Sequence, residues 1–240
     1  MKILVLQHVD VEHPGIFRDF MQGEGLSWDT VELDQGENIP DVSRYDLMLV
    51  MGGPQDVWQE DEFSWLREEK AAIHRFVADL KRPFLGVCLG HQLLAEALGG
   101  KVGPAREPEV GVLTIQKSSD GLTDPVMASV PNPATVLQWH GAEVVAAPPG
   151  ARILAYSDRC AVQSFRYGRH AYGVQFHVEL TEETVAAWAS IPVYAAALDS
   201  ALGRGAALRL KEQVVHLMPA FNRDARAIYD AFMSQVRQTV

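Results

Sequence analysis

The sequence predicts a doubly wound α/β domain, in which helices cover both faces of a mostly parallel central sheet. Over roughly the first half of the chain, short aliphatic runs alternate with longer segments whose apolar residues recur at helical spacing. This alternation is typical of βαβ units. After residue 110, several short runs follow one another with turn residues between them, which predicts additional antiparallel strands. A chain of 240 residues with 48% hydrophobic content can bury the core of one such domain.

The first half of the chain contains four predicted strands and three predicted helices. Each strand is a short run of β-branched or aliphatic residues, at 3–6, 29–33, 45–51 and 83–87. Each helix has apolar residues three and four positions apart, at 11–22, 63–80 and 91–98. The exposed face of the longest helix is expected to carry Arg67, Glu68, Glu69 and Lys70. Glycines follow the first and third helices, where they commonly end a helix.

The second half is predicted to add five strands and a helical C-terminal region. The strands are expected at 112–116, 135–139, 152–156, 162–167 and 169–176. The helical region is expected to begin at 181–190 and to continue to the C-terminus, with breaks at Pro192, 203–205 and Pro219. The sequence shows no internal repeat, low-complexity segment or linker, so one domain is expected.

The composition excludes some classes of binding partner and indicates the cellular compartment. Acidic residues outnumber basic ones by 31 to 21, which gives a formal net charge of −10. Phosphate binding needs clustered positive charge, so neither nucleic acid nor an anionic membrane is expected as a partner. The first apolar run is too short for a signal peptide, and no apolar run is long enough to span a membrane. Two cysteines do not make a disulfide framework, and together these features predict a cytoplasmic protein.

Cys88 lies where the fourth predicted strand gives way to the third predicted helix. Gly86 and Gly90 flank it in a G-x-C-x-G pattern, the cysteine counterpart of the G-x-S-x-G nucleophile elbow. Glycines there allow a sharp turn and close backbone approach, and the N–H groups at a helix start stabilise a thiolate. The pattern favours a nucleophilic cysteine over a buried structural one. Cys160, by contrast, has no base near it in the sequence and is interpreted as structural.

A nucleophilic cysteine needs a base, and His177 is the best placed of the eight histidines. It follows the predicted strand at 169–176, and Glu179 comes two residues later. Residues i and i+2 of an extended chain project to the same side. Glu179 would then orient the imidazole while the other ring nitrogen faces Cys88, as in a nucleophile–base–carboxylate triad. Spacing alone equally allows a histidine at a strand end beside a solvated glutamate.

Taken together, these motifs resemble those of the class I, triad-type glutamine amidotransferases. The resemblance rests on G-V-C-L-G-H-Q and, some ninety residues later, F-H-V-E. Further matches in order and spacing are M-G-G-P, E-D-E-F-S-W-L-R-E-E-K, Q-W-H-G-A-E, S-D-R-C-A-V-Q-S-F-R-Y-G and A-Y-G-V-Q-F-H. The subfamily most similar is that of stand-alone GMP synthase-like proteins. The resemblance implies a flavodoxin-like fold with a glutamine amidotransferase domain at 1–190. Residues 191–240 match no family motif and are expected to form a helical extension packed on the same domain.

The resemblance implies a role for each matching residue. Cys88 would attack the side-chain amide carbon of glutamine, forming a γ-glutamyl thioester and releasing ammonia, while His177 shuttles the proton and Glu179 orients the histidine. Backbone N–H groups of Gly53 and Leu89 would form the oxyanion hole. The α-amino and carboxylate ends of the glutamine would be held by Gln92 and the main chain around Trp139, His140 and Gly141.

The resemblance also bears on cofactors and partners. It implies no metal and no organic cofactor, and the sequence has no C-x-x-C, H-E-x-x-H or Walker A motif. In the biosynthetic enzymes of the family the ammonia passes to a synthase domain. The matching region already uses about 190 of the 240 residues, so the partner to be sought is a separate synthase or acceptor protein.

Two departures from the family pattern bear on the site. The usual F-H-P-E is F-H-V-E here, with Val178 in place of proline, and both functional side chains are kept. The acid that often follows W-H-G is replaced by Ala142, with Glu143 one position later, which would alter the contact with a ligand's amino group or with a partner subunit. Two alternatives to a glutaminase or amidotransferase subunit therefore stay open. One is a hydrolase of other γ-glutamyl compounds, and the other is a non-catalytic ligand-binding homologue, against which the intact triad counts.

Overall fold

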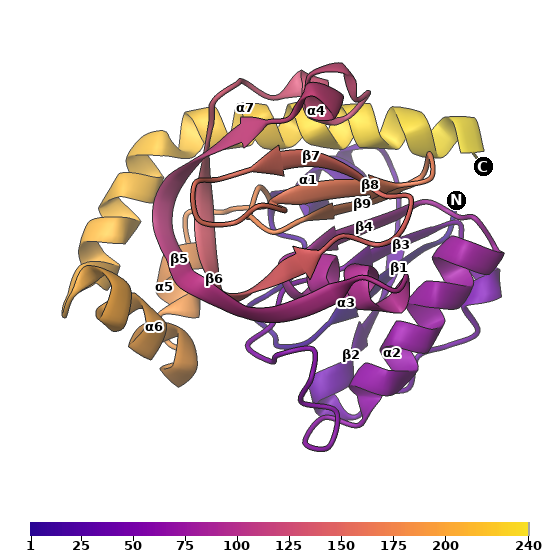
Figure 1. The fold of residues 1–240 in the computed structure, drawn as a ribbon, viewed down its shortest axis with the longest axis horizontal. Helices are drawn as coiled ribbons and strands as arrows, with labels where there is room; N and C mark the ends of the chain where they lie inside the picture. Colours follow the sequence, from indigo (N-terminus) through magenta and orange to yellow (C-terminus); the bar gives the residue numbers. More distant parts are fainter. Residues whose placement is uncertain (240) are drawn as a thin grey trace.

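Nine strands form one continuous mixed sheet in the computed structural model, which describes residues 1–239 (Figure 1). The strands are β1 Ile3–Gln7, β2 Trp28–Glu32, β3 Leu47–Val50, β4 Phe84–Val87, β5 Lys101–Lys117, β6 Ala134–Ala146, β7 Arg152–Tyr156, β8 Ser164–Tyr167 and β9 Ala171–Val174. Their order across the sheet is β2-β1-β3-β4-β9-β8-β7-β5-β6. The first five strands in this order pair in parallel, and the later pairs are antiparallel. The predicted α/β class with added antiparallel strands is confirmed.

The parallel half of the sheet is buried on both faces. Every residue of β1, β3, β4 and β9 is buried, which explains why these strands are continuous hydrophobic runs in the sequence. Neighbouring residues enter different core clusters: Ile3 and Leu47 pack on one face, and Leu4 and Met48 pack on the other. Because helices complete both clusters, the sheet is doubly wound, as predicted.

Each face of the parallel half is covered by its own pair of helices (Figure 1). The helices are α1 Ile16–Gly23, α2 Trp65–His74, α3 Leu89–Ala97, α4 Ser119–Thr123, α5 Thr184–Trp188, α6 Pro192–Leu202 and α7 Ala206–Thr239, with a π-helical turn at Arg75–Asp79 and 3₁₀ turns at Leu33–Gln35, Val42–Arg44 and Met127–Ser129. Side chains of α1 and α7 share one core cluster, and those of α2 and α3 share the other. Within residues 1–239, no helix combines the length and apolarity that crossing a membrane requires.

A third core cluster joins the C-terminal helices to the β5–β6 ribbon. This ribbon is long and curved, and α5 and α6 lie beside its bend (Figure 1). Val110 and Trp139 of the ribbon pack with Trp188 of α5, Leu198 of α6 and Val214 of α7. The cluster therefore brings the C-terminal region against the ribbon strand that carries Trp139.

The structure differs from the prediction at Pro219 and at the start of strand β5. The expected break at Pro219 is wrong, because α7 continues through it with Met218 and Phe221 buried on either side. Burial of this long apolar face outweighs the one backbone hydrogen bond that a proline removes. Strand β5 begins at Lys101 rather than 112, and its added part includes Pro104, which lies where the ribbon has an irregular register.

The first helix starts later than predicted, at Ile16 rather than 11. Gly15, directly before it, has φ +49°, and a Cβ added there would lie 1.6 Å from the carbonyl oxygen of Glu179. The Ile16 N–H donates to that same oxygen at 2.9 Å. The loop at 11–15 is therefore shaped by its contact with the segment that follows His177, and it buries Glu12 there.

Candidate active site

Cys88 occupies the turn between β4 and α3, at the carboxyl end of a central strand. Its backbone has φ 52° and ψ −104°, and within residues 1–239 Lys81 is the one other non-glycine residue with a positive φ. A conformation of this kind costs on the order of 1–3 kcal/mol and persists only where its surroundings enforce it. The Cys88 N–H donates to the Val174 carbonyl at 2.8 Å, and the Cys88 carbonyl accepts from the His91 N–H at 3.1 Å. Both sides of the strained turn are thus held in place.

The two glycines that flank Cys88 have no room for a side chain. A Cβ on Gly86 would lie 2.3 Å from the Gly90 carbonyl oxygen, and a Cβ on Gly90 would lie 2.1 Å from the Val50 carbonyl oxygen. Real Cβ atoms do not approach backbone oxygen this closely, so the start of α3 could not pack on β3 and β4 with any other residue at these positions. The close approach that the G-x-C-x-G pattern predicts is confirmed.

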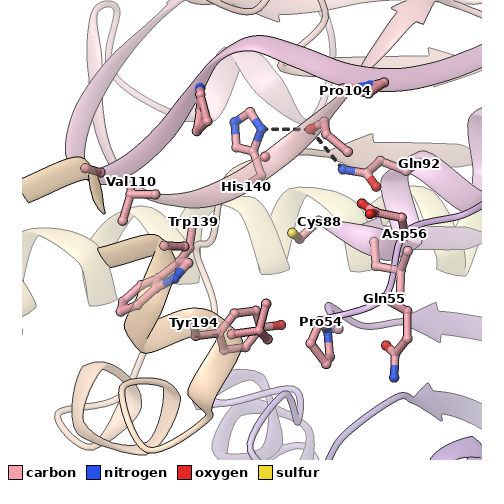
Figure 2. A pocket seen from close by; sticks show the side chains of 18 of the residues that line it. Pro54, Gln55, Asp56, Cys88, Gln92, Pro104, Val110, Trp139, His140 and Tyr194 are labelled. Carbon is pink, nitrogen blue, oxygen red and sulfur yellow. Dashed lines mark hydrogen bonds between the residues drawn. The ribbon is translucent and has the colours of Figure 1, made fainter. Parts of the chain in front are cut away.

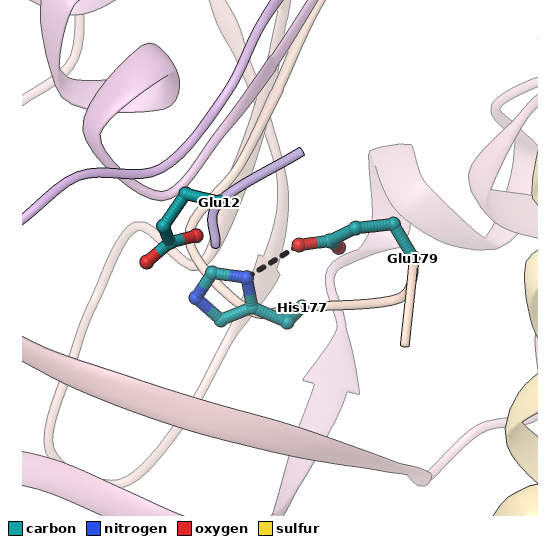
Figure 3. A group of neighbouring side chains, drawn as sticks. All are labelled: Glu12, His177 and Glu179. Carbon is teal, nitrogen blue, oxygen red and sulfur yellow. Dashed lines mark hydrogen bonds and ion pairs between the residues drawn. The ribbon is translucent and has the colours of Figure 1, made fainter. Parts of the chain in front are cut away.

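His177 and Glu179 are hydrogen-bonded to each other and buried (Figure 3). Nδ1 of His177 lies 2.7 Å from Oε1 of Glu179, and the other carboxylate oxygen accepts from the Val178 N–H at 2.9 Å. The His177 N–H donates to the Leu137 carbonyl at 2.9 Å, which anchors the segment to β6. The alternative of a solvated glutamate is wrong, since Glu179 is only 3% exposed.

The electrostatics couple His177 to the thiol of Cys88. Burial raises the pKa of Cys88, and the contact with His177 and the imidazolium charge offset that rise only in part. Burial lowers the pKa of His177, but the Glu179 carboxylate and the thiol together hold it well above its usual value. Nε2 of His177 has no hydrogen-bond partner within residues 1–239, the Cys88 sulfur included, so this nitrogen is free to exchange a proton with the thiol. His177 is therefore the group that lowers the cost of ionising the buried thiol of Cys88.

The loop after β3 brings Gly53 close to Leu89, the first residue of α3, beside Cys88. Gly53 and Leu89 both line the cavity in front of the sulfur, and the N–H of neither residue hydrogen-bonds to another group within residues 1–239. A Cβ on Gly53 would lie 2.9 Å from Cδ2 of Leu89 and 2.7 Å from Cβ of His8. The loop is therefore packed tightly between the elbow and the end of β1. Two unpaired N–H groups beside a nucleophile suit an oxyanion hole.

A cavity of about 580 Å³ opens in front of Cys88 (Figure 2). The sequence-predicted residues that line it are Gly53, Cys88, Leu89, Gln92, Trp139, His140 and Gly141. His177 and Glu179 do not line it. Helix α6 supplies one wall through Val193, Tyr194 and Ala197.

Hydrogen bonds within the protein restrict what the lining side chains can offer. Gln92 uses its amide N–H groups on the Ala142 carbonyl at 3.2 Å and on Oε1 of Gln175 at 3.0 Å, which leaves its own amide oxygen as an acceptor. His140 contacts the Ala142 carbonyl through Nδ1 at 2.9 Å and Glu109 through Nε2 at 3.2 Å. Because both ring nitrogens of His140 are engaged, its side chain has no ring nitrogen left for a ligand.

Glu12, which no sequence motif indicated, lies beside the His177–Glu179 pair (Figure 3). It is 2% exposed, its Oε1 accepts from the Tyr194 hydroxyl at 2.6 Å, and its Oε2 has no partner within residues 1–239. Burial raises the pKa of Glu12, opposed chiefly by the charge of His177 and the hydrogen bond from Tyr194. One side-chain oxygen or nitrogen from each of Glu12, His177 and Glu179 lies within 4.8 Å of the other two, close enough to bind a shared metal ion. His177 and Glu179 are hydrogen-bonded to each other and Glu12 to Tyr194, and no metal is assigned to the cluster.

His8 and Glu69 form a second pair that the sequence did not predict, and the exposed position expected for Glu69 is wrong. Glu69 was expected on the exposed face of its helix, but it is fully buried and its Oε1 lies 3.0 Å from Nε2 of His8. His8 follows β1, at the same edge of the sheet as Cys88. Polar side chains at the carboxyl ends of parallel strands are the ones that meet a ligand, and that signal was available in the sequence. The exposed positions expected for Arg67 and Glu68 are confirmed.

Cys160 is buried, as expected for a structural cysteine. Burial raises the pKa of its thiol to about 12, so the thiol stays protonated near neutral pH. A thiol in that state is a poor nucleophile. The charges of Glu143 and Glu109 raise the pKa of Cys160 further, whereas His177 acts to lower that of Cys88.

Comparison with known proteins gives several relatives of this chain. Glutamine amidotransferase-like protein YfeJ of Salmonella typhimurium is 33% identical over 191 residues, covering 77% of this chain and 78% of that protein. Gamma-glutamyl peptidase 5 of Arabidopsis thaliana is 31% identical over 165 residues, covering 67% of this chain and 64% of the peptidase. One subunit of the glutamine-hydrolysing GMP synthase of Ignicoccus hospitalis is 33% identical over 142 residues, covering 59% of this chain and 70% of the synthase chain.

The fold and the sequence pattern lead to the same family. A crystal structure of a glutamine amidotransferase from Thermotoga maritima matches with a TM-score of 0.86 at 26% identity, covering 98% of both chains. The sequence profile described as "Glutamine amidotransferase class-I" matches residues 20–187, more than half of the chain. The chain therefore belongs to the class I glutamine amidotransferase family.

Proposed function

We propose that this protein hydrolyses the side-chain amide of glutamine, or of a related γ-glutamyl compound, through a thioester on Cys88. The observation that carries the proposal is the strained elbow of Cys88 beside the buried His177–Glu179 pair. A positive φ at a cysteine is maintained only by the surrounding packing. A thiol held this way next to an imidazole that can take its proton is suited to nucleophilic attack.

In the proposed reaction His177 receives the thiol proton and the thiolate attacks the amide carbon. The carbonyl oxygen becomes an oxyanion, which the N–H groups of Gly53 and Leu89 stabilise. As the C–N bond breaks, the imidazolium returns its proton to the leaving nitrogen, which departs as ammonia or an amine. Water then attacks the thioester with His177 as base, releasing glutamate and the Cys88 thiol. Glu179 keeps the imidazole oriented and stabilises its charged form.

The cavity provides groups for the invariant γ-glutamyl part of such substrates. The free amide oxygen of Gln92 is an acceptor suited to the α-ammonium group, and main-chain N–H groups at 139–141 are donors suited to the α-carboxylate. No metal or organic cofactor takes part in this scheme.

A γ-glutamyl peptidase activity is a second candidate, favoured by the site itself. Ala142 stands where relatives often carry an acid, and the cavity of about 580 Å³ is of a size that holds ligands larger than one amino acid. Its α6 wall is apolar at Val193 and Ala197, which suits an extended leaving group. One relative is named a gamma-glutamyl peptidase.

We also propose which part of the chain is the amidotransferase domain and which kind of protein receives the ammonia. Residues 1–190 are the amidotransferase domain with Cys88, His177 and Glu179, and of the extension at 191–240 the described residues 191–239 pack on it, while residue 240 lies outside the described residues. If glutamine is the substrate, the ammonia passes to a separate synthase or acceptor protein, as the name of the related GMP synthase chain suggests. A cytoplasmic location fits such a partner.

The test is turnover by the purified protein of glutamine and of a panel of γ-glutamyl amides and dipeptides. Release of glutamate and of ammonia or amine is measured beside Cys88→Ala, with Cys160→Ala as the matched control for the other cysteine. We expect turnover that Cys88→Ala abolishes and Cys160→Ala keeps. Glutamine turnover supports the glutaminase, and turnover of larger γ-glutamyl compounds alone supports the peptidase. No turnover and no thioester trapped on Cys88 would refute both.

A further inference from the structure

A second histidine–carboxylate pair lies against the loop that carries Gly53. His8 and Glu69 are both fully buried, and Nε2 of His8 lies 3.0 Å from Oε1 of Glu69. The other ring nitrogen, Nδ1, lies 2.8 Å from the carbonyl oxygen of Gly52. The ring is also stacked on Trp65, with centroids 5.4 Å apart and an interplanar angle of 21°. His8 is thus held by three contacts, and one of them is the loop backbone.

The acceptors around His8 determine where its protons are. A backbone carbonyl can only accept a hydrogen bond, so Nδ1 must carry a hydrogen. Nε2 faces a buried carboxylate, and a buried carboxylate without a compensating donor would be costly. Burial lowers the pKa of His8, but the charge of Glu69 and the two hydrogen bonds outweigh it and hold the pKa above its usual value. His8 is therefore an imidazolium that donates to both Gly52 and Glu69.

The bond from His8 acts on the same peptide unit that supplies the Gly53 N–H. The carbonyl of Gly52 and the N–H of Gly53 belong to one planar group, and this bond is trans, because the cis bond found within residues 1–239 is at Asn132–Pro133. In a trans peptide the C=O and N–H point in opposite directions. A donor fixed on the carbonyl side therefore fixes the direction of the N–H on the other side. It also polarises the peptide, which strengthens the N–H as a donor.

The peptide is held from a second direction as well. The Glu12 carboxylate packs against Gly52 so closely that a Cβ there would lie 2.3 Å from Oε2. Gly53 in turn lines the cavity next to Cys88 and Leu89. The loop therefore has little freedom to rotate its peptide away from the sulfur.

We propose that His8, charged and oriented by Glu69, is a positioning residue that fixes and polarises the Gly52–Gly53 peptide as an oxyanion donor. This inference rests on the proposed function, because an oxyanion forms only if Cys88 attacks a carbonyl. It assigns Glu69 the same relation to His8 that Glu179 has to His177. The His8–Glu69 pair serves the oxyanion, and the His177–Glu179 pair serves the nucleophile.

The test compares His8→Asn and Glu69→Gln with matched controls on exposed positions of α2, His74→Asn and Glu68→Gln. Since removing an oxyanion donor lowers kcat by about 10²–10³-fold, weakening one by losing His8 is expected to lower kcat by about 10–100-fold with KM within about threefold. In Glu69→Gln an amide N–H can donate to Nε2 of a neutral imidazole, so Nδ1–H remains on Gly52 and only the charge is removed; a smaller fall in kcat is expected. The rate of Cys88 alkylation by iodoacetamide needs no oxyanion hole and should stay within about twofold.

Each outcome decides the inference. Normal kcat in both His8→Asn and Glu69→Gln, with an active wild type, would overturn it and leave the proposed function intact. An equal fall in kcat and in alkylation rate would show a general loss of structure and would also overturn it. If His8→Asn does not fold, Glu69→Gln decides by the same two measurements. A wild type without Cys88-dependent turnover of any γ-glutamyl compound would overturn the proposed function, and the inference with it.

Discussion

Removing the hydroxyl of Tyr194 should destabilise the protein, and the loss should depend on pH. In Tyr194→Phe the ring remains in place among Trp139 and Trp188, whose centroids lie 6.0 and 6.2 Å from it. The hydroxyl donates to Oε1 of Glu12 at 2.6 Å, and Oε2 has no partner within residues 1–239. The substitution therefore takes away the one hydrogen bond of a carboxyl group that water does not reach.

The size of the effect follows from the burial of Glu12. A hydrogen bond to a charged group contributes about 1.5–3 kcal/mol, and for a chain of this size that corresponds to a fall in Tm of about 3–12 °C. The matched control is Tyr45→Phe, whose hydroxyl donates to Asp29 at 2.9 Å. Asp29 is exposed, so water replaces the lost donor and the expected loss is below about 1 kcal/mol.

The sign of the pH dependence follows from the pKa of Glu12. Burial raises this pKa above the ordinary value of 4.5, and the Tyr194 hydrogen bond opposes the rise; Tyr194→Phe therefore raises it further. A carboxyl group with a raised folded-state pKa keeps its proton more tightly in the native state, so its destabilising effect is absent at low pH. The effect grows as pH rises from the unfolded pKa through the folded one. The difference in Tm between wild type and variant should thus be larger at about pH 8 than at about pH 5.

Thermal unfolding followed by circular dichroism measures both variants at both pH values. Equal losses of Tm in Tyr194→Phe and Tyr45→Phe would mean that the burial of Glu12 does not increase the cost of losing the hydrogen bond. A loss independent of pH would mean that the carboxyl group keeps the same protonation state throughout. Either result would refute the reasoning.

Three further predictions concern the site and its supports. Glu179→Gln should lower kcat by about 10²–10⁴-fold, because the imidazole of His177 loses the charge that fixes its orientation and stabilises its protonated form; steady-state turnover measures this, and a fall below tenfold would contradict it. Gly90→Ala should cost at least about 1–3 kcal/mol of stability, as overpacking against backbone does, seen as a lower urea midpoint. The raised pKa of His8 means that the stability it gains from Glu69 is present below its unfolded pKa and is lost as pH rises through the folded one. Urea midpoints of wild type and Glu69→Gln should therefore differ most at acidic to neutral pH and converge above the folded pKa, and a constant difference would argue against a charged pair.

The parts of the site that were predictable are those whose geometry is local. The turn at Cys88 is set by neighbours within two residues, since Gly86 and Gly90 are the positions where a side chain does not fit. The pairing of His177 with Glu179 follows from the alternation of an extended chain, and the hydrogen bond at 2.7 Å confirms it. In both cases the chain alone limits where the side chains can point, so short-range pattern was sufficient.

His8 and Glu69 show why other parts were not predictable. They are 61 positions apart, and Glu69 stands among Arg67, Glu68 and Lys70, a run that is typical of a solvated helix face. Helical periodicity places Glu69 within three or four positions of the buried Leu66 and Ile73, but a carboxylate is seldom buried unless it is paired. Only the packing of α2 beside the end of β1 provides that partner.

Tyr194 of the C-terminal region also makes contacts that the sequence did not predict. Helix α6 reads P-V-Y-A-A-A-L-D-S-A-L, which is apolar or small on nearly every side, so periodicity does not indicate its buried face. The structure buries Tyr194 and Leu198, four positions apart, and exposes Val193 and Leu202. Tyr194 reaches Glu12 across 182 positions of sequence and lines the cavity beside Cys88. A chain that stopped at residue 190 would leave the Glu12 carboxylate without its donor and the cavity without its α6 wall. The geometry therefore favours treating α6 as part of the catalytic site rather than as an appendage to it.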